Sequence, residues 1–447
     1  MRFSLGLVAS ALAATASAAD GKNFLGFNSG AEKVDKSAKF KEDFVAEFET
    51  AQDLKGAPGT FNAVRLYTNI QAYSEDDPIE AFEAAIDTKT HILLGAWASG
   101  TDNIDKELSA LKKAVKKFGK DFTDLVIGIS IGSEDLYRDS VTGLKNDPDG
   151  LGNSPEAIVS FIQDYKKTFA GTALGKVPVG HVDTWDVWPN STIKPVIDAV
   201  DFVGVNEFPY YENDKGNDIK RAGILFDNAY EAAKAAVGDK PVWITETGWP
   251  VSGIDWDEAE PSVKNAKYYW DEVGCRQLFN KVPTFWYILR DSNGANKQKF
   301  AITKDLSTTP LFDLSCPAKF DTPKLKAKES ATTSESETTS TKAAKTSTSA
   351  PAASTTGSSS DDDEDEEETG TQTTASAPEQ TSGSSDDETS SGSDGAAGSD
   401  NSDDSGDADN TEDGDEPETT EGAASAYAAS TLTYGSMLIA AVVAIMA

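Results

Sequence analysis

Histidine and cysteine are scarce in this chain. Its 447 residues include two of each, at His91 and His181 and at Cys275 and Cys316. A protein-bound zinc ion takes four ligands, mostly from Cys, His and carboxylates, and a catalytic thiol needs a basic partner beside it. We therefore expect no metal site and no cysteine-based active site. We interpret the two cysteines as one disulfide formed in an oxidising compartment.

Long apolar runs are missing as well. A membrane-spanning helix needs about 20 apolar residues, whereas the run near the N-terminus covers only residues 5–14. Arg2 precedes this run and the small residues Ala16-Ser17-Ala18 follow it, which is the pattern of a cleaved secretory signal peptide. We predict that residues 1–18 are removed and that the protein is secreted.

A second short apolar run covers residues 437–447. It follows a spacer of roughly ten residues and the small residues Gly422-Ala423-Ala424, an order that predicts a GPI-attachment signal. We expect Gly422 to carry the anchor and residues 423–447 to be the removed propeptide. The mature protein would then lie on the outer face of the cell membrane or in the cell wall.

Aromatic residues are absent between residues 323 and 421. Residues 324–421 hold 27 acidic and five basic residues, so this segment carries about −22 of the chain's formal charge of −35. Such a polar, acidic composition cannot bury a core. We predict a disordered acidic Ser/Thr-rich stalk over residues 323–422 and one folded domain over residues 19–322. An acidic chain also repels phosphates, which argues against nucleic acid as a partner.

The predicted domain contains short apolar runs that alternate with amphipathic segments. Such alternation favours a parallel α/β fold, and nearly continuous apolar runs are typical of strands that are covered on both faces. Eight such runs in a domain of this size predict a (β/α)8 TIM barrel. A doubly wound open sheet is the alternative, but no Gly-rich phosphate fingerprint follows the first run. The runs cover residues 24–27, 63–67, 91–97, 125–131, 177–182, 200–205, 242–245 and 284–288.

Helices are expected between these runs. Apolar residues recur on one face over residues 104–118 and again over residues 158–169. Ser154-Pro155-Glu156 is a typical start for the second helix, because Ser caps the free N–H groups and Pro fits the first turn.

Two glutamates end predicted strands. Glu134 follows the fourth run and Glu246 the seventh. Reacting groups of a (β/α)8 barrel lie at the carboxyl ends of its strands, so we expect the two side chains to face one another. Cleavage of a glycosidic bond needs such a pair, because one carboxyl group protonates the departing oxygen while the other acts at the anomeric carbon. This chemistry requires no organic cofactor.

Aromatic side chains gather at or just beyond the same strand ends. Their flat faces could stack on the CH face of pyranose rings, although a core role is the competing interpretation for each one. These residues are Trp185, Trp188, Tyr210, Tyr211, Trp249, Trp286 and Tyr287.

The segment Ile244-Thr245-Glu246-Thr247-Gly248-Trp249-Pro250 resembles the nucleophile signature of glycoside hydrolase family 17, the β-1,3-glucanases. The pattern from Asn23 to Phe320 is similar to that family throughout. The resemblance implies that Glu246 is the nucleophile and Glu134 the proton donor and base. It also implies β-1,3-glucan as the partner and a retaining cleavage of internal bonds.

The resemblance implies a set of substrate-binding residues too. Asn206 lies in Val205-Asn206-Glu207-Phe208-Pro209-Tyr210, which resembles a family segment, and Tyr67 matches the family's tyrosine on the second strand. With the aromatic residues at the strand ends, the expected set is Tyr67, Asn206, Tyr210, Trp249 and Trp286.

Three positions depart from the family pattern. Ser133 stands before the acid/base where plant members usually have Asn, which leaves open which residue meets the sugar 2-hydroxyl. Phe208 stands where Tyr is common and so removes a hydroxyl near the nucleophile. Val251 replaces a small polar residue, which we expect to affect substrate subsites more than chemistry.

Two other functions stay open. A sugar hydroxyl could replace water in the second step, which would make the protein a β-1,3-glucanosyltransferase that remodels wall glucan. A protein of another class, a wall mannoprotein that binds glucan without cutting it, is opposed by the intact pair of glutamates. We further expect N-glycosylation at Asn190, in the one sequon Asn190-Ser191-Thr192, and a monomer.

Overall fold

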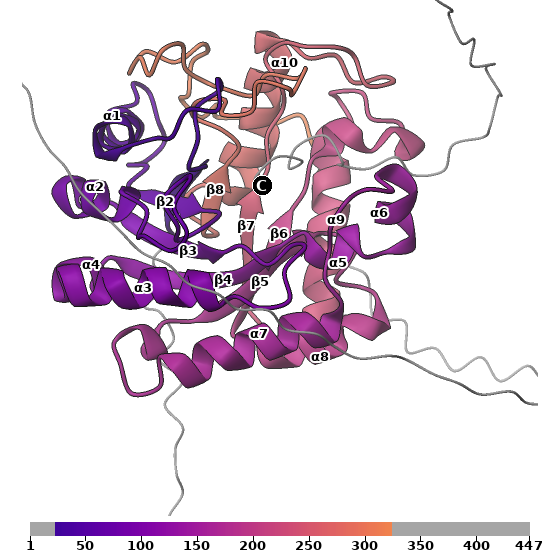
Figure 1. Cartoon of the computed structure of the whole chain (residues 1–447). Coiled ribbons are helices and arrows are strands. Elements are labelled where there is room, and N and C mark those ends of the chain that lie inside the picture. The colour runs from indigo at the N-terminus through magenta and orange to yellow at the C-terminus, as the bar shows by residue number, and fades with distance from the viewer. Residues whose placement is uncertain (1–22, 324–447) are drawn as a thin grey trace, which may run out of the picture. The chain divides into compact units, whose positions relative to one another are not determined.

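The computed structural model describes residues 23–323 (Figure 1). The predicted signal peptide, almost all of the predicted stalk, the propeptide and the attachment site at Gly422 lie outside the described residues. Within residues 23–323, no helix is long and apolar enough to cross a bilayer.

The described part of the chain forms a closed barrel of eight parallel strands, each hydrogen-bonded to the next and the last to the first. This confirms the predicted (β/α)8 fold, and each strand overlaps the apolar run that predicts it. The strands are β1 (Leu25–Ser29), β2 (Ala63–Leu66), β3 (His91–Ala96), β4 (Val126–Ser133), β5 (Val179–Thr184), β6 (Phe202–Asn206), β7 (Val242–Glu246) and β8 (Thr284–Trp286).

Helices cover the outside of the barrel (Figure 1). Helix α3 (Asp105–Phe118) and helix α7 (Pro155–Thr168) correspond to the two predicted amphipathic segments. Ser154 caps α7 as expected, since its hydroxyl accepts a hydrogen bond from the N–H of Ala157. The other helices are α1 (Lys41–Gln52), α2 (Ala81–Thr88), α4 (Lys120–Thr123), α5 (Asp135–Arg138), α6 (Val141–Asn146), α8 (Lys194–Ala199), α9 (Ala222–Val237), α10 (Val263–Tyr269) and the π-helical segment η5 (Trp270–Leu278).

The inside of the barrel is filled in layers. Because successive residues of a strand point to opposite faces, every second side chain faces inward. A lower layer is apolar and consists of Ala63, Leu93, Phe202, Trp243 and Phe285 from five strands. The next inward residues toward the carboxyl ends include Arg65 on β2 and Thr245 on β7, so the apolar floor carries polar groups above it.

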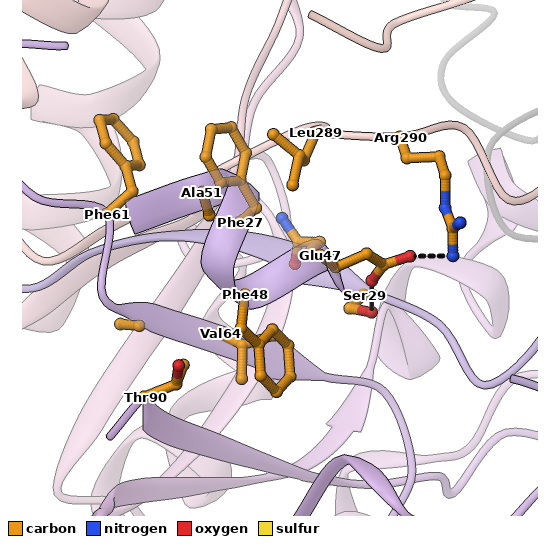
Figure 2. Close-up of a pocket in the computed structure, with 12 residues that line it drawn as sticks. Phe27, Ser29, Glu47, Phe48, Ala51, Phe61, Val64, Thr90, Leu289 and Arg290 are labelled. Carbon is orange, nitrogen blue, oxygen red and sulfur yellow. Dashed lines mark hydrogen bonds and ion pairs between the residues drawn. The ribbon is translucent and has the colours of Figure 1, made fainter. Parts of the chain in front are cut away.

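A small cavity lies on the helix side of β1, between that strand and α1 (Figure 2). Its volume is about 10 Å³, which is room for about one water molecule. Beside it Ser29 donates a hydrogen bond to Glu47 (2.6 Å), and Glu47 forms ion pairs with Lys39 and Arg290. This buried ion cluster ties α1 to the barrel. The cavity beside it is too small for a sugar.

Candidate active site

The two predicted carboxyl groups lie at the same end of the barrel. Glu246 is the last residue of β7 and Glu134 directly follows β4, and their exposed fractions are 0% and 1%. Asn206 on β6 pairs in register with Glu246 and donates a hydrogen bond from Nδ2 to Oε1 of Glu134 (2.9 Å). Asn206 therefore contacts Glu134 through its side chain and pairs with Glu246 through its strand.

Glu246 forms a buried ion pair. Its Oε1 accepts hydrogen bonds from Nη1 of Arg65 (2.6 Å) and from the hydroxyl of Tyr67 (2.9 Å). Two donors therefore converge on the same oxygen of this carboxyl group. Oε2 of Glu246 has no hydrogen-bond partner among the described residues, so one oxygen keeps its lone pairs free for attack.

Glu134 is placed to keep a proton. The pKa of Glu134 is raised to about 7, chiefly by burial. The Arg138 guanidinium opposes this rise, and the negative charge of Glu246 adds to it. Nη2 of Arg138 lies 3.2 Å from Oε2 of Glu134. The backbone of Glu134 is left-handed, with φ of 59°, and its N–H donates to the carbonyl of Val182 (2.9 Å). Strain of this kind costs about 1 to 3 kcal/mol and is typical of active sites.

Arg65 joins the two halves of the site. Besides Glu246 it binds Oδ1 of Asn28 through Nη1 (2.8 Å) and Oγ of Ser133 through Nη2 (2.9 Å). Ser133, the position that departs from the plant pattern, therefore gives its hydroxyl to Arg65 as an acceptor. Arg65 is not among the site residues expected from the sequence. The available signal is a charged residue inside an apolar strand, which must find a buried partner.

The predicted aromatic residues divide into two groups. Tyr67 contacts Glu246, whereas Tyr210, Trp249 and Trp286 are buried, with exposed fractions of 0%, 2% and 2%. Tyr210 and Trp249 pack edge to face, and Trp249 donates a hydrogen bond from Nε1 to the carbonyl of Glu260 (2.9 Å). These contacts do not fit the expected stacking of Tyr210 and Trp249 on sugar rings.

Trp286 points away from the barrel interior. Its ring packs against Tyr269, Trp270 and Phe279 in the layer between strands and helices. The next residue, Tyr287, has the opposite parity and so faces inward. Burial, and then the charge of Glu246, raise the pKa of Tyr287 well above its ordinary value. Tyr287, and not Trp286, is thus the aromatic side chain at the end of β8 that faces the interior of the barrel.

The remaining predicted residues lie away from the carboxyl pair. Cys275 and Cys316 form a disulfide between positions 41 residues apart in the sequence. Asn190 is exposed at the start of a short 3-10 helix, where its side-chain oxygen accepts hydrogen bonds from Thr192. Its glycosylation stays a prediction. Among residues 23–323 no group of three or more His, Cys, Asp or Glu side chains is arranged to hold a metal ion.

A parallel (β/α)8 barrel with two buried glutamates at the ends of β4 and β7 has the architecture of a glycoside hydrolase. Residues 27–302 match the family model described as the BtgE/BtgC glycoside hydrolase domain. The chain belongs to this family, and the resemblance to β-1,3-glucanases of family 17 is confirmed by its relatives.

Fungal relatives are similar over the whole barrel. A protein of Aspergillus terreus named "Probable glucan endo-1,3-beta-glucosidase eglC" is 50% identical over 314 residues, which is 70% of this chain and 64% of that protein. The chain thus spans less than two thirds of that relative. A protein of Schizosaccharomyces pombe named "Glucan 1,3-beta-glucosidase" is 27% identical over 62% of this chain and 81% of its own length.

A solved structure has the same barrel. The family 17 β-1,3-glucanosyltransferase of Rhizomucor miehei is 25% identical, covers 66% of this chain and 98% of its own chain, and superposes with a TM-score of 0.53. An active-site mutant of the R. miehei enzyme, solved with laminaritriose, is 23% identical with a TM-score of 0.52 and supports the fold assignment.

Proposed function

We propose that this protein is a retaining glycoside hydrolase that cleaves internal β-1,3-glucosidic bonds of cell-wall β-1,3-glucan. The observation that carries the proposal is the contrast between the two carboxyl groups. Glu246 is paired with Arg65, while burial raises the pKa of Glu134 to about 7. The names of the Aspergillus relatives, which are 50% identical, support β-1,3-glucan as the substrate.

The first step uses both groups at once. Oε2 of Glu246 attacks the anomeric carbon while Glu134 gives its proton to the departing glycosidic oxygen, which forms an ester and releases the shortened glucan. In the second step Glu134, now a carboxylate, takes a proton from water, and the water oxygen displaces Glu246. A retaining mechanism of this kind predicts carboxyl groups about 5 to 5.5 Å apart.

Matched glutamine variants test these roles. Glu246→Gln should abolish cleavage of both laminarin and an aryl laminaribioside with a strongly acidic phenol as leaving group. Glu134→Gln should abolish laminarin cleavage but still release the phenol, because that leaving group needs no proton. Equal loss on both substrates in both variants, or full activity of Glu246→Gln, would contradict the assigned roles. If the unmodified protein binds laminarin but cleaves it no faster than Glu246→Gln does, the result would support the non-catalytic glucan-binding mannoprotein.

Transfer of the glucosyl group is the second candidate. The similarity to the R. miehei β-1,3-glucanosyltransferase favours it, because the same ester can be resolved by a sugar hydroxyl. Incubation with a single laminarin oligosaccharide separates the two reactions. Products longer than the input show transfer, whereas shorter products alone show hydrolysis.

We also propose that the enzyme acts at the cell surface as a monomer held by a GPI lipid, with the acidic stalk between the lipid and the barrel. The apolar run at residues 437–447 and the small residues at 422–424 support the anchor, and the run at residues 5–14 supports secretion. Phosphatidylinositol-specific phospholipase C should release the protein from membranes, and a Gly422→Pro variant should not be anchored at that residue.

A further inference from the structure

His181 lies below the acid/base segment and is completely buried on β5. Its Nδ1 is 2.6 Å from the carbonyl oxygen of Ile131, and its Nε2 is 3.0 Å from Oδ2 of Asp183. A neutral imidazole has one N–H and would turn the lone pair of its other nitrogen toward an oxygen lone pair. Both nitrogens can be satisfied only when both carry a proton.

Both oxygens of Asp183 act as hydrogen-bond acceptors. Oδ2 accepts a backbone N–H hydrogen bond from Leu136 (3.0 Å), and Oδ1 accepts them from Tyr137 (3.3 Å) and Thr184 (2.9 Å). The contact between Asp183 and Nε2 of His181 therefore calls for a proton on the ring nitrogen. Two of these donors follow Glu134 closely in the sequence, so Asp183 fixes the chain on the carboxyl side of the acid/base.

Asp135 fixes the chain on the other side of Glu134. It is buried, and its Oδ2 accepts a hydrogen bond from the N–H of Ser133 (2.7 Å) while its Oδ1 accepts one from Ser99 (2.7 Å). Gly132 leaves room for this contact, since a Cβ there would lie 2.3 Å from Oδ2 of Asp135 and 3.0 Å from Cε1 of His181. Imidazole and carboxylate therefore face one another across a glycine.

We propose that His181 is a positioning residue, a buried imidazolium whose charge lets Asp135 and Asp183 together hold the backbone that presents Glu134. This inference rests on the proposed role of Glu134. The charged groups that face the ring are Asp183 from β5 and Asp135 from α5. The other neighbours are the carbonyl of Ile131 from β4 and the ring of Trp188, which packs edge-on. Burial lowers the pKa of His181, but the two aspartates outweigh it and leave the pKa raised.

The protonation state can be measured without activity. In the full chain labelled with 15N-histidine, His181 should still show two nitrogen-bound ring protons at pH 7, above the ordinary histidine pKa of about 6.5. His91→Gln assigns the signals, because the described chain then retains His181 as its one histidine. A single ring proton on His181 at pH 7 would overturn the inference.

Two substitutions with opposite charge effects test the link to Glu134. His181→Gln keeps a donor toward Asp183 but removes a positive charge, so the alkaline limb of kcat/KM should move up by about one pH unit. Asp183→Asn removes a negative charge that raises the pKa of Glu134, so the same limb should move down. His91→Gln, on β3, should leave the limb in place.

The outcomes separate the two claims. If Glu134→Gln keeps full activity on laminarin, the proposed function fails, and the ring protons of His181 still report its charge. If Glu134→Gln is inactive but neither His181→Gln nor Asp183→Asn moves the limb, the positioning role is overturned. Should His181→Gln fail to fold, the Asp183→Asn profile and the labelled unmodified protein still decide the question.

Discussion

Glu134 and Glu246 are the same side chain in two different surroundings. Glu246 faces Arg65 and the hydroxyl of Tyr67, which stabilise its charge. Glu134 is buried with the negative charge of Glu246 near it, and its one cationic contact, Arg138, is 3.2 Å away. Environment alone can therefore assign one residue to attack and the other to proton transfer.

This difference predicts the pH dependence of the reaction. Since Glu134 must be protonated to act as an acid, kcat/KM on laminarin should fall as the pH rises above about 7, where the pKa of Glu134 lies. The pH profile of initial rates measures it. A limb that lies below pH 5, near the ordinary carboxyl pKa, would contradict the assignment.

The same raised pKa of Glu134 also predicts how the stability of the fold depends on pH. The folded-state pKa of about 7 lies above the ordinary 4.5, so unfolding releases a proton between these values and stability falls as the pH rises through this range. Glu134→Gln should remove this fall and stabilise the protein at pH 8 by on the order of 3 kcal/mol. Thermal unfolding at pH 4 and pH 8 provides the comparison, and a variant less stable than the unmodified protein at pH 8 would count against it.

Arg65 should matter for both chemistry and folding. Arg65→Met leaves the carboxylate of Glu246 buried without its cation, which costs about 3 to 5 kcal/mol of stability, and kcat should fall about 10² to 10³-fold. Thermal melts and laminarin kinetics measure the two effects. The double variant Arg65→Met with Glu246→Gln should recover stability but not activity. An Arg65→Met enzyme within threefold of normal kcat would show that the ion pair is dispensable.

At the scale of elements, Glu107 on α3 connects the segments that follow β2 and β3. Its carboxylate accepts hydrogen bonds from Thr68 (2.5 Å) and from the backbone (2.7 Å) and side chain (2.9 Å) of Asn69, all after β2, and from the N–H of Trp97 (3.2 Å) after β3. Tyr67, which binds Glu246, directly precedes this anchored stretch.

Replacing Glu107 should therefore loosen the segments after β2 and β3 without changing the catalytic carboxyl groups. Glu107→Gln keeps one acceptor oxygen but turns an amide donor toward other donors, so about 1 to 3 kcal/mol of stability is lost. We expect KM for laminarin to rise several-fold while kcat changes less. Steady-state kinetics beside Glu83→Gln, a control in the first turn of α2 whose side chain pairs with Lys41 and Lys117, would detect this. A change confined to kcat would contradict the role of Glu107 as a loop support.

The sequence is sufficient to predict the strands but not which side chains at their ends face the interior of the barrel. Buried parallel strands are apolar on both faces, so all eight stand out as runs, yet no alternation tells which residues face inward. Trp286 and Tyr287 show the consequence, since the expected sugar contact points outward and its neighbour points inward. A motif resemblance supplies Glu134 and Glu246, because they belong to local segments.

Contacts between distant strands are beyond a local sequence pattern. Arg65 meets Ser133 and Glu246 across 68 and 181 residues of sequence, and His181 meets Ile131 across 50. These pairs exist because the barrel closes, so only the fold brings them together. The left-handed backbone at Glu134 is another feature that only the fold determines, because a glutamate by itself disfavours that conformation.

At the scale of the whole molecule, the disulfide ties the end of the domain to the barrel. Cys275 in η5 and Cys316 enclose 41 residues of separation, and closing a loop of that length stabilises a fold by about 4 kcal/mol. Cys275→Ser with Cys316→Ser should lower Tm by about 6 °C in a domain of this size. Differential scanning calorimetry measures the shift, with the unmodified protein under reducing conditions as the matched control. An unchanged Tm in both samples would show that the bond adds no stability.

The stereochemistry of the first product tests the central claim most directly. If Glu246 forms an ester that water then displaces, two inversions occur and the new reducing end of a laminarin oligosaccharide appears as the β-anomer. Proton NMR recorded within the first minutes, before mutarotation equalises the anomers, distinguishes the two forms. We predict an early excess of the β-anomer, and an early excess of the α-anomer would contradict the account.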